Sequence, residues 1–205
     1  MKKMFLIIVL IFMVSCGKKA TVHIKAINTV TGEPYAGLAY GITATSSGFN
    51  GEKKVFEETG TLDANGEAYV SVRVKTGRTY SVGTSKPPNM CYDKSIQYTF
   101  GKEDLPNLDF QFEYAECANF NLEIHNVNCQ GPSDTFTYKR KWLNGDDQGI
   151  FQTQTGCYNF AGNFIQLPIG SYKYEWEVTR SGVTTFHDSL FSLSENQYYT
   201  FVLNY

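Results

Sequence analysis

Apolar and polar residues alternate with a period of two along most of the chain, which is the pattern of half-buried β-strands. In residues 21–27, for example, Val22, Ile24 and Ala26 share one face while His23 lies on the other. No stretch has the apolar spacing of an amphipathic helix, so the pattern predicts an all-β chain. The predicted strands are residues 21–27, 38–45, 68–75, 79–82, 94–100, 108–114, 119–126, 135–143, 149–155, 163–167, 172–179, 186–193 and 198–205.

Turn-forming residues separate these strands. Asn65-Gly66 predicts a β-hairpin, because a tight primed turn needs positive φ at its centre. Asp63 and Glu67 beside it could be taken as calcium ligands, but the spacing of a calcium loop is missing, so we favour a turn. Residues 46–54 are polar and rich in glycine, which predicts a loop.

Two modules of similar pattern follow one another, at residues 20–117 and 118–205. Each contains in turn a Tyr-bearing strand, a polar loop, a penultimate strand, an acidic turn and an aromatic last strand. The acidic turns are residues 102–104 and 194–196. We interpret this repetition as a degenerate duplication. The predicted fold is therefore two tandem small antiparallel β-sandwich modules.

The chain begins with two lysines and an apolar run at residues 4–14, followed by Ser15 and Cys16. The run is well short of the about 20 residues that a membrane-spanning helix needs, and predicts a signal peptide over residues 1–15. Residues 13–16 resemble a bacterial lipobox. That resemblance implies that Cys16 carries lipid and attaches the protein to a membrane, with residues 16–19 as a tether.

The residues after Cys16 bear on its location. Gly17 stands where an acidic sorting residue would otherwise be, which by resemblance to Gram-negative lipoproteins implies the outer membrane. The surface-export signals of Bacteroidetes-like bacteria are acidic at this point. Lys18 and Lys19 depart from them, which favours a position that faces the periplasm.

Residues 30–38, 61–67 and 77–82 carry turn motifs that resemble the carboxypeptidase regulatory-like modules. These modules are similar to transthyretin-like β-sandwiches, and the resemblance covers residues 21–83. It implies a non-catalytic spacer or binding module on an exported bacterial protein. The second module lacks the Asp-x-Asn-Gly turn of the first, so its resemblance to the family is weaker and its membership stays open.

Four cysteines remain after Cys16, and an even number in an exported chain predicts disulfides. If residues 94–100 and 108–114 pair as an antiparallel hairpin, Cys91 lies opposite Cys117. Folding about residues 144–145 likewise brings Cys129 near Cys157. We predict these two bridges, one in each module. Four free thiols are the alternative, as are other pairings, since sandwich strands often cross between sheets.

Composition excludes several functions. Lys and Arg number 18 against 20 Asp and Glu, a net charge of −2, so no basic surface for nucleic acid is expected. Hydrolase and phosphate-binding motifs are missing, and the cysteine spacing is unlike that of zinc sites. His23, His125 and His187 are isolated in the sequence. We therefore predict a chain that is not an enzyme and has no cofactor or metal.

The remaining candidates for ligand contact are aromatic. Tyr172, Tyr174 and Trp176 share one face of a strand and could stack on a sugar, but Val178 continues the same face, which favours a buried core face. The sequence thus predicts a lipid-anchored cell-envelope protein that is a non-catalytic binding or structural module, with a protein or glycan partner. The alternative is a glycan-binding lipoprotein that uses exposed aromatic residues, Trp142 and Trp176.

Overall fold

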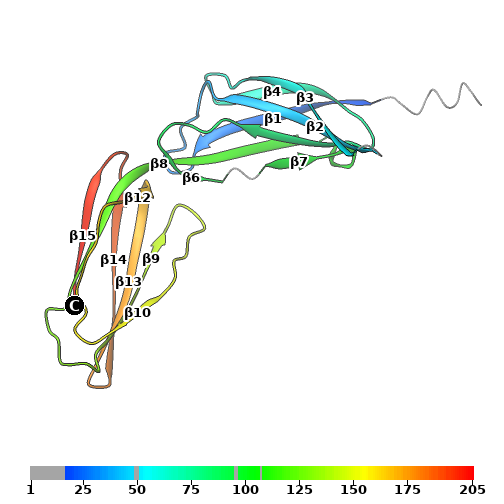
Figure 1. The fold of residues 1–205 in the computed structure, drawn as a ribbon. Helices are drawn as coiled ribbons and strands as arrows, with labels where there is room; N and C mark the ends of the chain where they lie inside the picture. The colour runs from blue at the N-terminus through cyan, green and yellow to red at the C-terminus, as the bar shows by residue number, and fades with distance from the viewer. Residues whose placement is uncertain (1–16, 49–50, 95–96, 107) are drawn as a thin grey trace, which may run out of the picture. The chain divides into compact units, whose positions relative to one another are not determined.

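The computed structural model describes residues 17–48, 51–94, 97–106 and 108–205 (Figure 1). These residues are almost entirely β-strand and form two compact units. Unit 1 contains the described residues up to Asn28, with Gly32–Pro87 and Lys94–Tyr114; unit 2 contains Thr29–Thr31, Pro88–Asp93 and Ala115–Tyr205. The predicted signal peptide, residues 1–15, and the candidate lipidation site Cys16 lie outside the described residues.

Unit 1 is built from two sheets. In the first, β1 lies between β4, which is antiparallel to it, and the first part of β8, which is parallel to it. The second has the order β3-β2-β5-β7. A single turn of 3₁₀ helix, η2, follows β7. The elements are β1 (Lys18–Asn28), β2 (Ala39–Gly48), β3 (Gly51–Thr61), β4 (Glu67–Val74), β5 (Thr79–Thr84), β7 (Tyr98–Phe100), η2 (Lys102–Asp104) and β8 (Leu108–His125).

Alternate residues of these strands form the core of unit 1, as period-two patterning requires. Val22 and Ile24 of β1 and Ile42 of β2 are fully buried. Tyr80 of β5 is also buried, and its hydroxyl donates to the carbonyl of Arg73 in the other sheet at 3.1 Å. A buried phenol needs such a partner, so this bond fixes how the two sheets face each other.

Unit 2 repeats the arrangement. The second part of β8 pairs in parallel with β15 and antiparallel with β11 and β12, and a separate sheet has the order β10-β9-β13-β14. Short β6 also pairs with β8. The elements are β6 (Met90–Asp93), β9 (Thr135–Trp142), β10 (Gln152–Thr155), β11 (Phe160–Ala161), β12 (Ile165–Pro168), β13 (Gly170–Arg180), β14 (Val183–Leu193) and β15 (Tyr198–Asn204).

The core of unit 2 is aromatic. Phe191 of β14 stacks on Tyr172 and Phe201 with ring centroids 5.4 and 5.1 Å apart, and Phe136 stacks on Tyr205 at 4.1 Å. Stacked pairs at such separations stabilise a core beyond the area they bury. The aromatic face of β13 is therefore core rather than an open platform.

The two units have the same strand order. In each, the first strand lies between the fourth strand and the last, and the second sheet runs third-second-fifth-sixth. In each, the first strand is parallel to the last, β1 with β8 in unit 1 and β8 with β15 in unit 2. The prediction of an all-β chain of two sandwiches is confirmed, with this parallel pair as an added feature. The common order supports the interpretation of residues 20–205 as a degenerate duplication.

The predicted loop at residues 46–54 was wrong. β2 extends to Gly48 and β3 starts at Gly51, and the two strands pair along their whole length. β3 is an edge strand with almost no buried residue. β3 is held by its backbone hydrogen bonds to β2 and not by burial of side chains. Its sequence therefore lacks the apolar alternation on which the prediction relied.

Asn65-Gly66 forms a turn but not the predicted hairpin. Only Gly66 has positive φ, at 67°, and the Asp63 carboxylate accepts the backbone N–H of Asn65 and Glu67 at 2.9 Å each. The turn carries the chain from β3 in one sheet to β4 in the other, where β4 pairs with β1. The local turn chemistry was predicted correctly, whereas the strand partner depends on distant residues.

The predicted hairpin of residues 94–100 with 108–114 does not form, because its two strands belong to different sheets. β7 pairs with β5, and residues 108–114 of β8 pair with β1. The strand before the predicted hairpin, β6, pairs with β8 instead. The Cys117 N–H donates to the Asn89 carbonyl at 3.0 Å, so β6 keeps nearly the register that was expected of the hairpin.

Unit boundaries also differ from the predicted ones. β8 continues through the predicted boundary at 117/118, and the contact-based units divide at Tyr114 and Ala115. Lys18 and Lys19, assigned to the tether, are the first residues of β1. Adjacent residues are both buried at Tyr114–Ala115 and at Cys117–Ala118, so the alternation changes phase within one unbroken strand.

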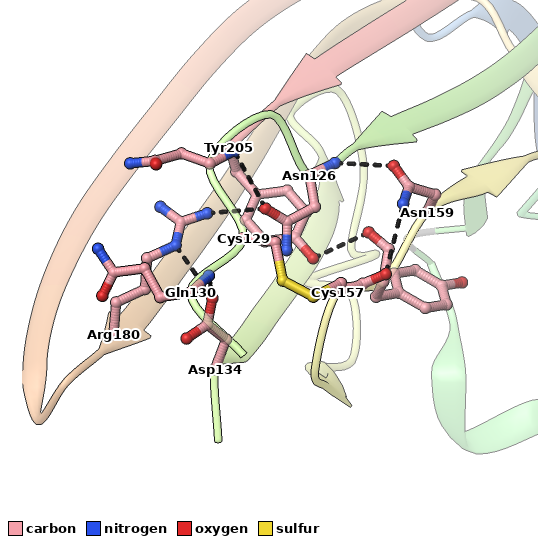
Figure 2. Close-up of a disulfide and its surroundings, with 10 residues drawn as sticks. Asn126, Cys129, Gln130, Asp134, Cys157, Asn159, Arg180 and Tyr205 are labelled. Atoms are coloured by element: carbon pink, nitrogen blue, oxygen red, sulfur yellow. Dashed lines mark hydrogen bonds and ion pairs between the residues drawn. A yellow bond between two sulfur atoms is a disulfide. The ribbon is translucent and has the colours of Figure 1, made fainter. Parts of the chain in front are cut away.

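The structure joins Cys91 to Cys117 and Cys129 to Cys157, the same two pairs that the sequence predicts. Their Cα atoms are 5.0 and 5.3 Å apart, within the usual disulfide range. Figure 2 shows the second bridge fixing the loop that follows β8. All four cysteines belong to unit 2, which differs from the prediction of one bridge per module.

We expect Gly66→Ala to destabilise unit 1 by about 2–3 kcal/mol. The alanine would have to adopt the positive φ of Gly66, and its Cβ would lie 2.7 Å from the Ala26 carbonyl oxygen. Gly77→Ala is the matched control, with φ of 76° and nothing within 4 Å of the added Cβ; it should cost about 1 kcal/mol. Chemical denaturation measures both, and equal losses would contradict the packing argument.

Peptide mapping without reductant should recover Cys91–Cys117 and Cys129–Cys157. Bridges separated by 26 and 28 residues should each stabilise unit 2 by about 3 kcal/mol. Reduction should therefore speed amide hydrogen exchange in the core strands of unit 2 and leave β1 and β4 unaffected. A Cys117–Cys129 peptide, or four thiols that alkylate in the native protein, would refute the pairing.

Candidate functional site

A groove of about 620 Å³ opens at one side of unit 2. It lies between the edge strand of one sheet, β10, and the edge strands of the other, β11 and β12. Its volume is within the range of small-molecule sites in proteins. The lining residues come from six strands, the loop after β9 and the segment between β11 and β12: Phe120, Leu122, Tyr138, Lys139, Arg140, Asp147, Gly149, Ile150, Gln152, Phe160, Gly162, Asn163, Ile165 and Tyr174.

Buried aromatic residues form part of the lining. Phe120, Tyr138 and Tyr174 are less than a tenth exposed. Burial raises the pKa of Tyr138 to about 12 and also raises the pKa of Tyr174. The Tyr138 hydroxyl donates to Gln152 at 2.7 Å. Both phenols therefore stay protonated at physiological pH and supply neutral hydrogen-bonding groups.

Arg140 supplies the positive charge of the groove. It lies opposite Tyr174 in the pairing of β9 with β13, and its guanidinium carbon is 5.4 Å from the centroid of Phe120 and 6.0 Å from that of Tyr172. Its Nε is buried without a hydrogen-bond partner. Among the described residues no carboxylate lies within ion-pairing distance of Arg140. An arginine held between aromatic rings and lacking an anion is unusual inside a sandwich.

Exposed apolar residues surround this interior. Ile150 is 85% exposed, Ile165 50% and Phe160 40%, and all three line the groove. Single exposed apolar side chains are ordinary, but several gathered at one opening mark a contact surface. The groove thus combines an apolar border with a cation and two phenols inside.

Trp142, one of the two tryptophans predicted to stack on a ligand, cannot do so. It is 3% exposed, and its indole N–H donates to the Ile169 carbonyl at 3.0 Å. Tyr92 packs against it with ring centroids 4.6 Å apart. The strand pattern did place Trp142 in phase with Phe136 and Tyr138, which are buried as well.

Trp176, the other candidate, is half-buried. It packs against the aromatic core of unit 2 and stacks on His187 at 5.5 Å. It contributes to a second, smaller groove of about 310 Å³, together with Phe151 and Phe186. Trp176 is thus partly accessible at this groove, and its stacking on a sugar stays a prediction.

The outer face of β13 carries a network of ion pairs. Glu175 pairs with Lys141 at 2.8 Å, Lys173 at 3.2 Å and Lys139 at 3.3 Å. The hydrogen bond from Lys141 is the main cause that lowers the pKa of Glu175 to about 2. Asp188 and Glu175 in turn raise the pKa of Lys173. Every charge here has a partner, so the network is a stabilising surface feature.

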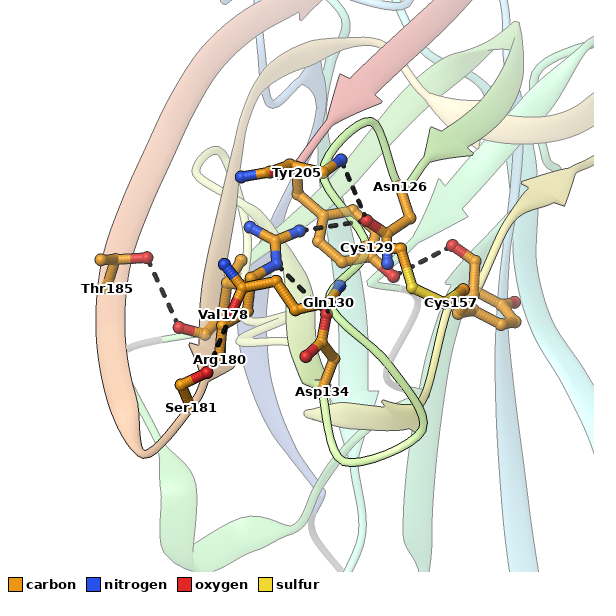
Figure 3. Close-up of polar contacts among 12 residues, drawn as sticks. Asn126, Cys129, Gln130, Asp134, Cys157, Val178, Arg180, Ser181, Thr185 and Tyr205 are labelled. Carbon is orange, nitrogen blue, oxygen red and sulfur yellow. Dashed lines mark hydrogen bonds and ion pairs between the residues drawn. A yellow bond between two sulfur atoms is a disulfide. The ribbon is translucent and has the colours of Figure 1, made fainter.

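A second polar cluster surrounds the disulfide of Cys129 (Figure 3). Arg180 contacts the buried Asp134 carboxylate at 3.3 Å and donates to Asn126 at 3.1 Å. The same carboxylate accepts the Gln130 N–H at 2.9 Å. These contacts hold the loop after β8 against the end of β13. Because Asp134 is 1% exposed, the cluster serves structure and offers no access to a ligand.

Sequence reasoning missed Arg140, although a signal for it exists. Arg140 follows Phe136 and Tyr138 at the period of two, so a charged residue occupies the core face of a predicted strand. Lys139 and Lys141 beside it obscure this phase. The remaining groove residues come from segments far apart in sequence and could not be grouped without the fold.

The described residues contain neither a metal-binding cluster nor a membrane-spanning helix. In the described part of the chain no group of three or more His, Cys, Asp or Glu residues is placed to hold a metal ion. Residues 17–48, 51–94, 97–106 and 108–205 contain no helix of the length and apolar character needed to cross a membrane.

No protein-family model and no curated protein matches the chain. Solved structures that resemble it are pilins. They include a variant of the shaft pilin SpaA from Lactobacillus rhamnosus GG (7% identity, TM-score 0.36, 92% of this chain and 98% of that one) and the minor pilin GBS52 of Streptococcus agalactiae (12%, 0.34, 90% and 94%). The major pilin BcpA of Bacillus cereus is similar at 12% identity and a TM-score of 0.33, over 85% of this chain and 69% of that one.

Similarities this low are no basis for assigning a family or a function. The resemblance of residues 21–83 to carboxypeptidase regulatory-like modules stays a prediction, since no family model matches. The resemblance of residues 13–16 to the lipobox of a Bacteroidetes-like lipoprotein stays a prediction as well.

The Glu175 network should make stability depend on pH. Since the folded pKa is lowered to about 2 from the usual 4.5, its stabilisation is complete above about pH 4.5 and is lost as pH falls toward 2. Glu175→Gln should lower the free energy of unfolding by about 1 kcal/mol at pH 7, discounted for screening by solvent, and by nothing at pH 2. Urea titrations at several pH values measure this.

Glu177→Gln is the control for that experiment. Glu177 lies on the same strand and face, and it makes no ion pair with another described residue. Its substitution should leave the pH profile of stability unchanged. A profile that shifts equally in both variants would show that general surface charge, and not the lysine cluster, controls the acid response.

Proposed function

We propose that this chain is a lipid-anchored, non-catalytic binding module of the bacterial cell envelope. The groove of unit 2 carries the proposal, because a cation without an anion partner at the bottom of an apolar opening is a costly arrangement that ligand binding would relieve. The lipobox-like residues 13–16 support the anchor, and two disulfides in one unit suit an oxidising compartment.

A binding role fits the chemistry of the groove better than catalysis does. Its titratable groups are Arg140, Lys139, two phenols of raised pKa and Asp147, whose carboxylate accepts the Gly149 N–H at 2.9 Å. A general base or nucleophile needs a pKa near the working pH or an activating neighbour. Recognition through charge, hydrogen bonds and apolar contact needs neither.

The anchor and its location are part of the proposal. We place the protein in the outer membrane, held by lipid on Cys16 and facing the periplasm. Each buried methylene of an acyl chain contributes about 0.8 kcal/mol, so two or three chains are enough to hold the protein to a bilayer. β1 starts at Lys18, which would keep unit 1 close to the membrane surface.

Replacing Cys16 by Ala should abolish incorporation of labelled palmitate and remove the protein from the outer-membrane fraction. Ser15→Ala, one residue away, should retain both properties and serves as the control. Proteinase K added to intact cells should leave the wild-type chain uncut. Palmitate labelling that persists in Cys16→Ala would refute the anchor, and cleavage in intact cells would refute the periplasmic orientation.

A further inference from the structure

We propose that the groove of unit 2 binds an anionic amphiphile, a molecule with a carboxylate or phosphate head and an apolar chain or ring. The head would lie on Arg140 and the apolar part along Phe160 and Ile165. This inference rests on the proposed binding function and specifies the class of its ligand.

The anionic head follows from the state of Arg140. Its Nε is buried without a partner, and no described carboxylate lies close enough for an ion pair. The rings of Phe120 and Tyr172 lie near the guanidinium, with centroids 5.4 and 6.0 Å from its carbon. Guanidinium groups bind planar carboxylates and phosphates through paired N–H donors. The missing partner is therefore an anion that enters through the opening.

The other charged residues that line the groove are already engaged. The Lys139 ammonium pairs with Glu175 on the outer face of the sheet and lies 4.1 Å from the centroid of Phe151. The Asp147 carboxylate accepts the Gly149 N–H within its turn. Arg140 is thus the charge that remains for a ligand.

The apolar part follows from the lining around Arg140. Leu122 and Ile165 come from one sheet, Ile150 from the loop beside the other, and Phe160 from β11. Ile150, Ile165 and Phe160 are 85%, 50% and 40% exposed. A chain or ring lying between them would remove this surface from water, which is the main source of affinity in such sites.

An extended peptide fits the same opening less well. A peptide added to a sheet edge gains its affinity from a ladder of backbone hydrogen bonds. The edges here are short, since β11 is 2 residues long and β10 and β12 are 4 each. Residues 162–164 interrupt the edge between β11 and β12. A small amphiphile uses the cation and the apolar lining without needing a continuous edge.

Calorimetric titration of decanoate and decanol into the full chain carrying Cys16→Ala, at pH 8 and below micelle-forming concentrations, tests the proposal. Decanoate should bind once per chain and at least tenfold more tightly than decanol. Arg140→Met, which keeps the aliphatic packing, should weaken decanoate at least tenfold and leave decanol unchanged. Lys141→Met removes a neighbouring charge on the opposite face and should change neither.

A second pair of variants tests the apolar contact independently of Arg140. Phe160→Ala should weaken decanoate and decanol alike, whereas Phe186→Ala, which removes a more exposed ring from β14 outside the groove, should weaken neither. Arg140→Lys should restore part of the preference for decanoate if Arg140→Met fails to fold. Phosphatidylglycerol vesicles that displace decanoate would identify a membrane lipid as the source; vesicles without effect would identify a free amphiphile.

Several results would overturn the proposal: no saturable decanoate binding, decanol binding as tightly as decanoate, an unchanged affinity in Arg140→Met, or displacement by an acidic peptide at lower concentration than by decanoate. These outcomes are separate from those for the anchor. If the wild-type chain is lipidated but the Cys16→Ala chain does not prefer decanoate, the anchor and envelope location stand and the ligand class is wrong. If decanoate binds but the wild-type chain is not lipidated in cells, the ligand class stands and the anchor is wrong.

Discussion

The backbone hydrogen bonds of β8 are the constraint on which both units depend. Residues 108–114 pair in parallel with β1 and complete the first sheet of unit 1, and residues 119–125 pair in parallel with β15 in unit 2. Parallel pairing of a first strand with a last one joins residues far apart in sequence, so it forms only when the whole unit closes. Its alternating side chains, such as Phe112 and Phe120, enter the cores.

The repetition of one strand order explains where the groove comes from. In unit 1 a single tight turn at Asp63–Gly66 joins the third strand to the fourth, and Leu62 beside it is buried. In unit 2 the fourth strand is divided into β11 and β12, with residues 162–164 between them. The groove of unit 2 lies at this divided edge.

Arg140 shows how this opening acquires a chemical character. Neighbouring lysines of β9 face outward and are neutralised by Glu175, whereas Arg140 lies on the core face. A partly buried cation whose Nε has no hydrogen-bond partner costs free energy unless something compensates for it. Aromatic rings supply part of that compensation through their negative faces.

The sequence by itself determined the all-β class, most strand positions, the turn at Gly66 and the cysteine pairs, because period-two alternation, positive-φ glycine and short-range register are local properties. It also separated core from surface in β13, where Tyr172 and Tyr174 are buried. Only the tertiary structure decided which strands pair, since β4 joins β1 and β7 joins β5 across long stretches of chain. It likewise decided the surroundings of Trp142 and Arg140: the strand pattern indicates only that both lie on the core face, whereas the burial of Trp142 and the place of Arg140 in the groove follow from how the two sheets close on each other, through contacts between distant residues.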